Sequence, residues 1–378
     1  MIRHALWLLL AVPAAAQEPL LEVRKADDTS LLTVHEDAAL LLRGALGEGT
    51  IPASGEGIRL MWHPAKAAFR AGGVSESQWD EENVGEYSAA FGNNNLVKGE
   101  RSMAAGSANE VTGSHAFAAG FGLQVTGTAS VALGDRAAAA GAASFAAGLS
   151  AAASGTGAVA LGRATEASGE ASTAAGFESR AVGQYSTATG YKTFAGGPQS
   201  TVMGSYAGTF GEGGFAYGDA SVTTINLTAT TNEFAVRASG GFRFRTNAGL
   251  VTGCNLPANS GTFECTSSRL AKTGFEDLDA DSVLARLATI PIRRWRYLET
   301  ETPHVGPTAE DFHAAFGLGS GPTTIATVDA DGITMLAVQA LIRRTDQLRD
   351  ENAQLRAEVA ALQAERTRAT FDVVPEGP

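Results

Sequence analysis

The sequence predicts a mostly β protein in which a parallel β-solenoid of 14-residue coils is followed by a small α/β domain and a C-terminal coiled coil. Three observations predict this organisation. Glycine recurs with a constant 14-residue period from Gly92 through Gly106 to Gly218 without an insertion, the composition changes at Ser267 to mixed α/β, and leucine recurs at a heptad spacing from Leu341 to Leu362. The fixed period is typical of stacked coils, and the leucine heptad is typical of a coiled coil.

Within each repeat, small and large residues alternate. Counted from Tyr87, glycine stands at the sixth place of all ten repeats and alanine at the fourth place of all but one, with larger residues such as Phe117 and Val131 at the third place. Val131 and Leu133 lie on either side of Ala132. Because strand side chains alternate between faces, we expect Ala132 and its equivalents to fill a narrow interior and the larger residues to form an apolar stripe outside. We expect the glycines to close the corners, where a positive φ is tolerated without a Cβ.

The repeat also carries a family resemblance. Copies such as ASVALGDRAAAAGA and GAVALGRATEASGE resemble the head repeats of trimeric autotransporter adhesins over residues 87 to 218. The resemblance implies a left-handed parallel β-roll, which we assign to residues 87–224, and association as a homotrimer. An alanine-lined interior buries little apolar area per coil, so the outer stripe also requires a partner. A polar low-complexity linker is the alternative interpretation.

Short alternating segments flank the repeats. Residues 17–86 contain runs such as Leu31 to Val34 between Asp- and Gly-rich turns, and residues 225–266 contain EFAVRASGGFRFRTN. Such alternation between turn residues predicts strands. We expect the first segment to cap the solenoid and the second to connect it to the next domain, because the ends of a solenoid need protection.

The N-terminus predicts export. Arg3 precedes an apolar run from Ala5 to Pro13, and small residues follow as far as Ala16. This order is typical of a secretory signal peptide, here residues 1–16; a short buried helix is the alternative. No later segment has the ~20 apolar residues of a membrane-spanning helix. We therefore expect a mature chain without a transmembrane segment that is secreted or held at a bacterial cell surface.

The charge balance and the scarcity of ligand residues limit the partners. The chain has 28 Lys and Arg against 40 Asp and Glu, and its net charge of −12 is unfavourable for binding nucleic acid. It contains no Gly-Lys dipeptide for a phosphate loop and no histidine cluster for a metal. We therefore expect no nucleic acid partner, no cofactor and no metal.

Cys254 and Cys265 are the only cysteines and lie close together in the sequence. In an exported chain, a small disulfide loop is a more natural role for such a pair than a metal site, which requires more ligands. Two free thiols are the alternative, because the geometry that a disulfide needs is not visible in a sequence.

The segment from residue 267 to 345 reads SSRLAKTGFEDLDADSVLARLATIPIRRWRYL, then HVGPTAEDFHAAFGLG, then VDADGITMLAVQALIRR. The order of its motifs resembles the peptidase S74 family, the intramolecular chaperone domain found behind phage tail spikes and fibres. The matching positions are Ser267, Arg269, Lys272, Trp295, Tyr297, His304, Gly306, Pro307, Asp329, Asp331 and Gly332. Ser268 stands where the family usually has Asp, and Glu310 where it often has Gln.

This resemblance implies a domain that trimerises the β-rich fibre before it and then cuts itself off at a serine. The cut would fall between Thr266 and Ser267, with Ser267 as the nucleophile, Lys272 as its base and His304 polarising the carbonyl. A lysine can take the serine proton when burial lowers its pKa, and an arginine cannot. Lys272 is the only lysine after Lys192. Any enzymatic activity is then at most that of an autoproteolytic serine peptidase acting on itself.

A structural interpretation of the same residues also stands. Ser267 or Ser268 could bond the backbone of a capped turn while Lys272 is solvated, and His304 could be a structural histidine.

Residues 338–367 are expected to form the coiled coil. A second set of residues lies three positions before each leucine of the heptad: Val338, Thr345, Asn352 and Val359. An amphipathic helix packed on its own domain is the alternative.

The sequence therefore indicates an exported, trimeric, fibrous surface protein of the adhesin type, assembled by its C-terminal domain, with a host-surface, glycan or matrix molecule as ligand. A prophage tail-fibre-like protein and a carbohydrate-active β-solenoid enzyme are the alternatives. The signal peptide disfavours the first, because phage fibres assemble in the cytoplasm. The clustered Asp, Arg and Lys of a polysaccharide-cleaving solenoid are missing from the coils.

Overall fold

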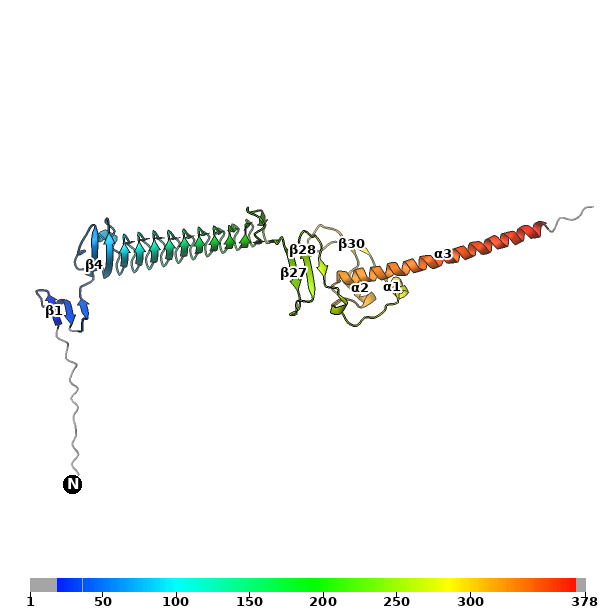
Figure 1. The fold of residues 1–378 in the computed structure, drawn as a ribbon, viewed down its shortest axis with the longest axis horizontal. Coiled ribbons are helices and arrows are strands. Elements are labelled where there is room, and N and C mark those ends of the chain that lie inside the picture. The colour runs from blue at the N-terminus through cyan, green and yellow to red at the C-terminus, as the bar shows by residue number, and fades with distance from the viewer. Residues whose placement is uncertain (1–18, 36, 372–378) are drawn as a thin grey trace, which may run out of the picture. The chain divides into compact units, whose positions relative to one another are not determined.

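The computed structural model describes residues 19–35 and 37–371. The chain divides into two compact units, Met1–Thr266 and Ser267–Pro378. The first unit is almost entirely β and contains a solenoid, and the second contains the α-helices (Figure 1). The expected signal peptide, residues 1–16, lies outside the described residues.

Each coil of the solenoid adds one strand to each of two sheets (Figure 1). Ala132 pairs in parallel with Ala118 on one side and Ala146 on the other, which are the equivalent residues of the repeats before and after it. The parallel solenoid and its coil length are thereby confirmed. The longer strands are β6 (Ala89–Asn93), β8 (Met103–Ser107), β10 (Phe117–Phe121), β12 (Val131–Asp135), β14 (Phe145–Leu149), β16 (Val159–Arg163), β18 (Thr173–Phe177), β20 (Thr187–Tyr191), β22 (Thr201–Ser205) and β24 (Phe215–Gly218). The shorter strands are β7 (Leu96–Val97), β9 (Glu110–Val111), β11 (Gln124–Val125), β13 (Ala138–Ala139), β15 (Ala152–Ala153), β17 (Glu166–Ala167), β19 (Arg180–Ala181), β21 (Phe194–Ala195) and β23 (Ala207–Thr209).

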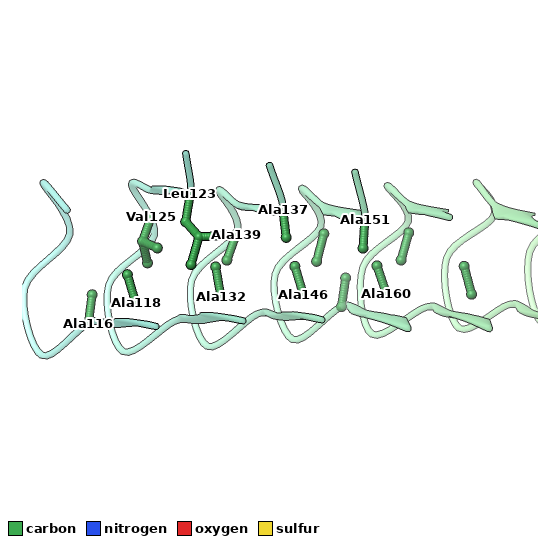
Figure 2. Packing of buried hydrophobic residues seen from close by; sticks show 14 of the residues in the cluster. Ala116, Ala118, Leu123, Val125, Ala132, Ala137, Ala139, Ala146, Ala151 and Ala160 are labelled. Carbon is green, nitrogen blue, oxygen red and sulfur yellow. The ribbon is translucent and has the colours of Figure 1, made fainter. Parts of the chain in front are cut away.

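The interior between the two sheets holds small side chains (Figure 2). Ala104, Ala132 and Ala160 are fully buried in one sheet and share a core with Val125 and Ala139 of the other. The larger residues at the third and fifth places of the repeat are partly buried or exposed. The predicted alternation of a small interior and a larger exterior is therefore confirmed.

Replacing Ala132 by Phe should destabilise the solenoid by roughly 1 to 3 kcal/mol or more, because the close-packed interior has no room for a ring. Chemical unfolding of the variant measures the effect. Val131→Phe is the matched control, since Phe117 and Phe145 already occupy the same register position in the adjoining coils. An Ala132→Phe variant as stable as the parent would show that the interior is wrongly assigned.

The corners of the solenoid lie at every seventh residue, and most of them are not glycine. Arg136 and Ala143, for example, adopt left-handed φ values of 52° and 54°. The backbone N–H of Arg136 donates to Phe121 O over 2.8 Å, which ties the corner to the preceding coil. The expectation that glycines close the corners is therefore wrong. The left-handed positions are Tyr87, Asn94, Arg101, Ala108, His115, Gly122, Ala129, Arg136, Ala143, Ser150, Gly157, Ala164, Ala171, Glu178, Tyr185, Lys192, Gln199, Tyr206 and Gly213.

The repeating glycine at the sixth place serves a different purpose. Gly134 lies within β12 at a φ of +106°, and a Cβ built on it would lie 2.4 Å from the carbonyl oxygen of Gly148 in the next coil. A side chain would force the coils apart at this point. The regular glycine period is thus set by the close approach of neighbouring backbones inside the sheet.

Large buried side chains close the N-terminal end of the solenoid. Arg70 pairs in register with Ala90 of the first coil and is fully buried, as is Trp79. The Arg70 guanidinium donates to the carbonyl oxygens of Ser88 (3.0 Å) and Val97 (3.2 Å), and burial lowers its pKa to about 10. The elements before the coils are β1 (Pro19–Arg24), β2 (Ser30–His35), β3 (Leu40–Leu42), β4 (Gly57–His63), the 3₁₀ turn η1 (Pro64–Lys66), β5 (Ala68–Val74) and the 3₁₀ turn η2 (Glu81–Asn83).

At the other end, the two parallel sheets continue past residue 224. β25 (Leu227–Ala229) pairs with β23, and β26 (Phe234–Arg237) pairs with β24. A separate antiparallel sheet follows. Its strands are β27 (Gly241–Arg245), β28 (Gly253–Pro257) and β29 (Glu264–Cys265).

The second unit has a small core of its own. Val283, Ile290, Phe312 and Ile333 are buried together where three helices pack. The elements are the 3₁₀ turn η3 (Arg269–Ala271), α1 (Ala280–Leu287), β30 (Arg293–Trp295), β31 (His304–Gly306), α2 (Ala309–Phe316) and α3 (Thr327–Phe371). The small β/α region and the C-terminal helix of the expected fold are confirmed.

The heptad leucines lie on α3, a single helix of 45 residues. Leu341, Leu348, Leu355 and Leu362 are between 48% and 64% exposed, so none of the described residues covers this row. No helix in the described part of the chain combines the length and the apolar character needed to cross a bilayer.

Candidate functional site

A single turn of 3₁₀ helix brings the serine and the lysine of the predicted dyad together. Ser268 precedes the turn η3, and Lys272 is the first residue after it. The turn folds the chain back so that Lys272 Nζ donates to Ser267 Oγ over 2.8 Å. This short spacing therefore places an amine in hydrogen-bond contact with a hydroxyl, which is the geometry that proton transfer requires.

Ser268 stabilises this turn. Its side-chain oxygen accepts from the backbone N–H of Leu270 over 3.3 Å, as an N-cap residue does. Serine and aspartate are both strongly preferred N-caps. Ser268 thus fills an N-cap position that an aspartate could also fill.

The dyad is exposed to solvent in the isolated chain. The lysine ammonium donates to the hydroxyl here, whereas a general base must first lose its proton and accept. Covering the dyad with further protein surface would favour the neutral amine, because burial disfavours the charged form. The single chain therefore provides the contact between the two groups but not the enclosure.

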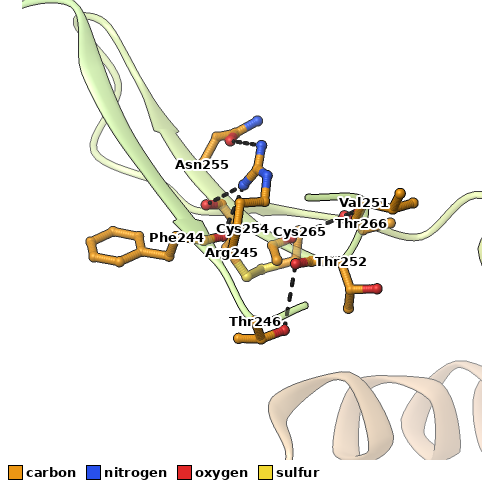
Figure 3. Close-up of a disulfide and its surroundings, with 10 residues drawn as sticks. Phe244, Arg245, Thr246, Val251, Thr252, Cys254, Asn255, Cys265 and Thr266 are labelled. Carbon is orange, nitrogen blue, oxygen red and sulfur yellow. Dashed lines mark hydrogen bonds between the residues drawn. A yellow bond between two sulfur atoms is a disulfide. The ribbon is translucent and has the colours of Figure 1, made fainter. Parts of the chain in front are cut away.

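Thr266, the residue before the dyad, is held by the last sheet of the first unit (Figure 3). Its N–H donates to Gly253 O over 2.9 Å, and its hydroxyl donates to Val251 O over 2.9 Å. A disulfide joins the neighbouring Cys265 to Cys254, which lies directly opposite on β28. The bond predicted to be cut is thus the covalent link between the two units, with a fixed residue on its N-terminal side.

His304 lies in a cluster of aromatic rings. Its ring is 4.9 Å from that of Trp295 and 5.5 Å from that of Tyr297. Within the part of the chain that the structure describes, no hydrogen bond joins it to Ser267 or Lys272. The part of His304 in catalysis stays a prediction. In the structure, its ring packs against aromatic rings at the β30–β31 hairpin.

One feature of the second unit was not visible in the sequence. Trp295 and Tyr297 line an open groove of about 710 Å³ together with Arg293, Pro307 and Ile325. Its walls come from segments that meet only in the fold, so no motif could indicate it. No group of three or more His, Cys, Asp or Glu side chains that could hold a metal occurs among the described residues.

Two family models match the chain in the order that its residues suggested. The model described as YadA head domain repeat matches residues 84–109, 153–179 and 181–207, and the model described as chaperone of endosialidase matches residues 267–317. Both resemblances are therefore confirmed. No curated protein matches the chain. In architecture the chain is similar to autotransporter or tail-fibre adhesins that carry a chaperone domain.

Proposed function

We propose that this chain is an exported, homotrimeric, fibrous surface protein of the adhesin type. Its C-terminal unit guides assembly and then cuts itself from the fibre between Thr266 and Ser267. One observation carries the proposal: a solenoid with exposed apolar side chains is followed, after a short antiparallel sheet, by a chaperone-like unit whose first residue contacts a lysine. The protein is secreted or held at the bacterial surface, where the head binds a host-surface, glycan or matrix molecule.

Each region has a role in this proposal. Residues 17–86 cap the head, 87–224 form it, 225–266 connect it, 267–345 are the chaperone and 338–367 form a coiled coil.

Apolar residues on both units support the homotrimer. On the solenoid, Phe91, Leu161, Met203 and Tyr217 at the fifth place of their repeats are between 37% and 43% exposed. The seam of α3 is exposed as well. Exposed apolar residues of this kind are costly to leave in water, and in a trimer of identical parallel chains each of the two sets would be buried against its own copies.

Leu161→Asp should destabilise the trimer by about 3 to 5 kcal/mol, because the axis would then hold unpaired buried charges. Val182→Asp is the matched control: Val182 is 38% exposed against 37% for Leu161, but it lies at a different place in the repeat. Sedimentation equilibrium measured in increasing denaturant gives the trimer stability of both. Equal losses of trimer stability in the two variants would contradict the proposal that the trimer axis runs along the apolar stripe.

The proposed cleavage is an acyl transfer to the serine followed by hydrolysis. The neutral amine of Lys272 takes the proton of Ser267 Oγ, and the oxygen attacks the carbonyl carbon of Thr266. The C–N bond breaks, the lysine returns its proton to the Ser267 nitrogen, and an ester joins the two residues. Water then hydrolyses the ester, which leaves a carboxylate on Thr266 and a fragment that begins at Ser267.

The exposed dyad explains why cleavage follows assembly in this proposal. In a single chain, Lys272 is exposed to solvent. In the proposed trimer, neighbouring chains cover the dyad, and burial disfavours the charged form of an amine. The chaperone unit is therefore released only from fibres that have already assembled.

A further inference from the structure

The Cys254–Cys265 disulfide lies immediately before the bond that is proposed to be cut. We propose that it is a positioning element for the self-cleavage: it fixes the segment that ends in Thr266, so that the Thr266 carbonyl carbon is held for attack by Ser267. This inference rests on the proposed self-cleavage and adds a requirement to it, namely that the chain is oxidised before it is cut.

The strand that immediately precedes Thr266 is too short to hold itself in place. β29 has two residues, both exposed, and it pairs with β28 only at Cys254–Cys265 and Asn255–Glu264. A strand of this length is marginal in water without tertiary support. The covalent bond between the opposed cysteines therefore adds a restraint that this short ladder cannot supply by itself.

The other end of the disulfide is attached to a firmer strand. β28 pairs with β27 over five residue pairs. The Arg245 guanidinium also donates to Asn255 Oδ1 over 2.7 Å and to Cys254 O over 3.2 Å (Figure 3). The disulfide thus links the residue next to Thr266 covalently to the better-ordered β27–β28 hairpin.

The remaining bonds of Thr266 leave its carbonyl available. Its N–H and hydroxyl are both donated to β28 and the residues before it, to Gly253 O and Val251 O. None of the hydrogen bonds in the described segments uses the Thr266 carbonyl oxygen as an acceptor. The group that must react is thus free, while the atoms around it are held.

Holding a carbonyl near its nucleophile accelerates an acyl transfer, and a misplacement of about 1 Å can cost about a hundredfold in rate. Disulfides form in oxidising compartments outside the cytosol. A chain still in the cytosol would lack the disulfide and would therefore be cut slowly, and rapid release of the chaperone unit would follow export.

The test compares cleavage rates after refolding from denaturant. The parent, Cys254→Ala/Cys265→Ala and Cys254→Val/Cys265→Val are refolded uncut, and the trimer fraction is isolated. Release of the fragment Ser267–Pro378 is then followed by denaturing electrophoresis. The valine pair maintains cross-strand packing without a covalent link, so it reports on positioning even if the alanine pair assembles poorly. Ser260→Ala, in the loop between β28 and β29, is the matched control.

We expect both cysteine-free trimers to cut at least about tenfold more slowly than the parent, which is well within the range that misplacement produces. The same loss is expected for parent chains refolded with a reductant, while Ser260→Ala retains the parent rate. Cysteine-free trimers that cut as fast as the parent overturn the positioning role alone. A parent trimer that stays full length overturns the self-cleavage proposal and this inference with it.

Discussion

Lys272→Arg and Ser267→Ala should each leave an intact trimer that never releases its C-terminal unit. Arginine can retain the hydrogen bond to Ser267, but it stays protonated and cannot accept the serine proton. Alanine removes the nucleophile. The rate of cleavage should fall by at least about a thousandfold in either variant, as it does when a member of a catalytic unit is lost. Denaturing electrophoresis should show the full-length chain and no fragment Ser267–Pro378.

Two controls make this result specific. Lys192→Arg is the same substitution at a lysine of the solenoid, and it should cut normally. Ser268→Asp restores the family's usual residue and a good N-cap, so it should cut at least as well as the parent. A Lys272→Arg trimer that still releases the fragment would exclude Lys272 as the base.

Deleting residues 267–367 should convert a soluble trimer into aggregates. Strands of the solenoid pair with the equivalent strands of the neighbouring coils, and this pairing must form in the correct register. Such non-local folding is slow and leaves apolar surface exposed while it proceeds. Without the C-terminal unit, we expect the exposed apolar stripe to associate non-specifically with other chains before a correct trimer can form. Size-exclusion chromatography with light scattering separates the outcomes.

The matched control for the deletion is Ser267→Ala, which retains the whole unit but cannot cut. It should give the same yield of soluble trimer as the parent. If the truncated gene gives soluble trimers, residues 267–367 are not required for assembly, and the proposed chaperone role is wrong.

The interior of the solenoid was predictable because one strong periodic signal determines it. The alanine at the position of Ala132 recurs in almost every repeat between larger neighbours, and a strand can satisfy that alternation in only one way. The prediction for the corners is wrong because a glycine with positive φ does not have to lie at a corner. Gly134 has a φ of +106° but lies inside β12, where the backbone of Gly148 in the next coil also leaves no room for a Cβ, and a local sequence pattern does not contain that contact. The corners themselves accept Arg136 or Ala143, since a hydrogen bond to the previous coil supports each one.

The site shows the same division between local and distant causes. Ser267 and Lys272 lie close together in the sequence, and one short turn brings them into contact, so the motif was sufficient to predict their hydrogen bond. His304 comes from a hairpin whose aromatic packing depends on Trp295 and Tyr297, and its role could not be read from the motif. The anchoring of Thr266 depends on β28, which no local pattern links to the scissile bond.

Native mass spectrometry of the full chain, produced with the proposed signal peptide in place and compared with the same sample under denaturing conditions, is the decisive experiment for the proposed assembly and cleavage. It reports stoichiometry and chain mass together. The account predicts a complex of three chains, each of which ends at Thr266, and a separate fragment that begins at Ser267. A monomer of full-length mass would contradict both the trimeric fibre and its self-cleaving chaperone.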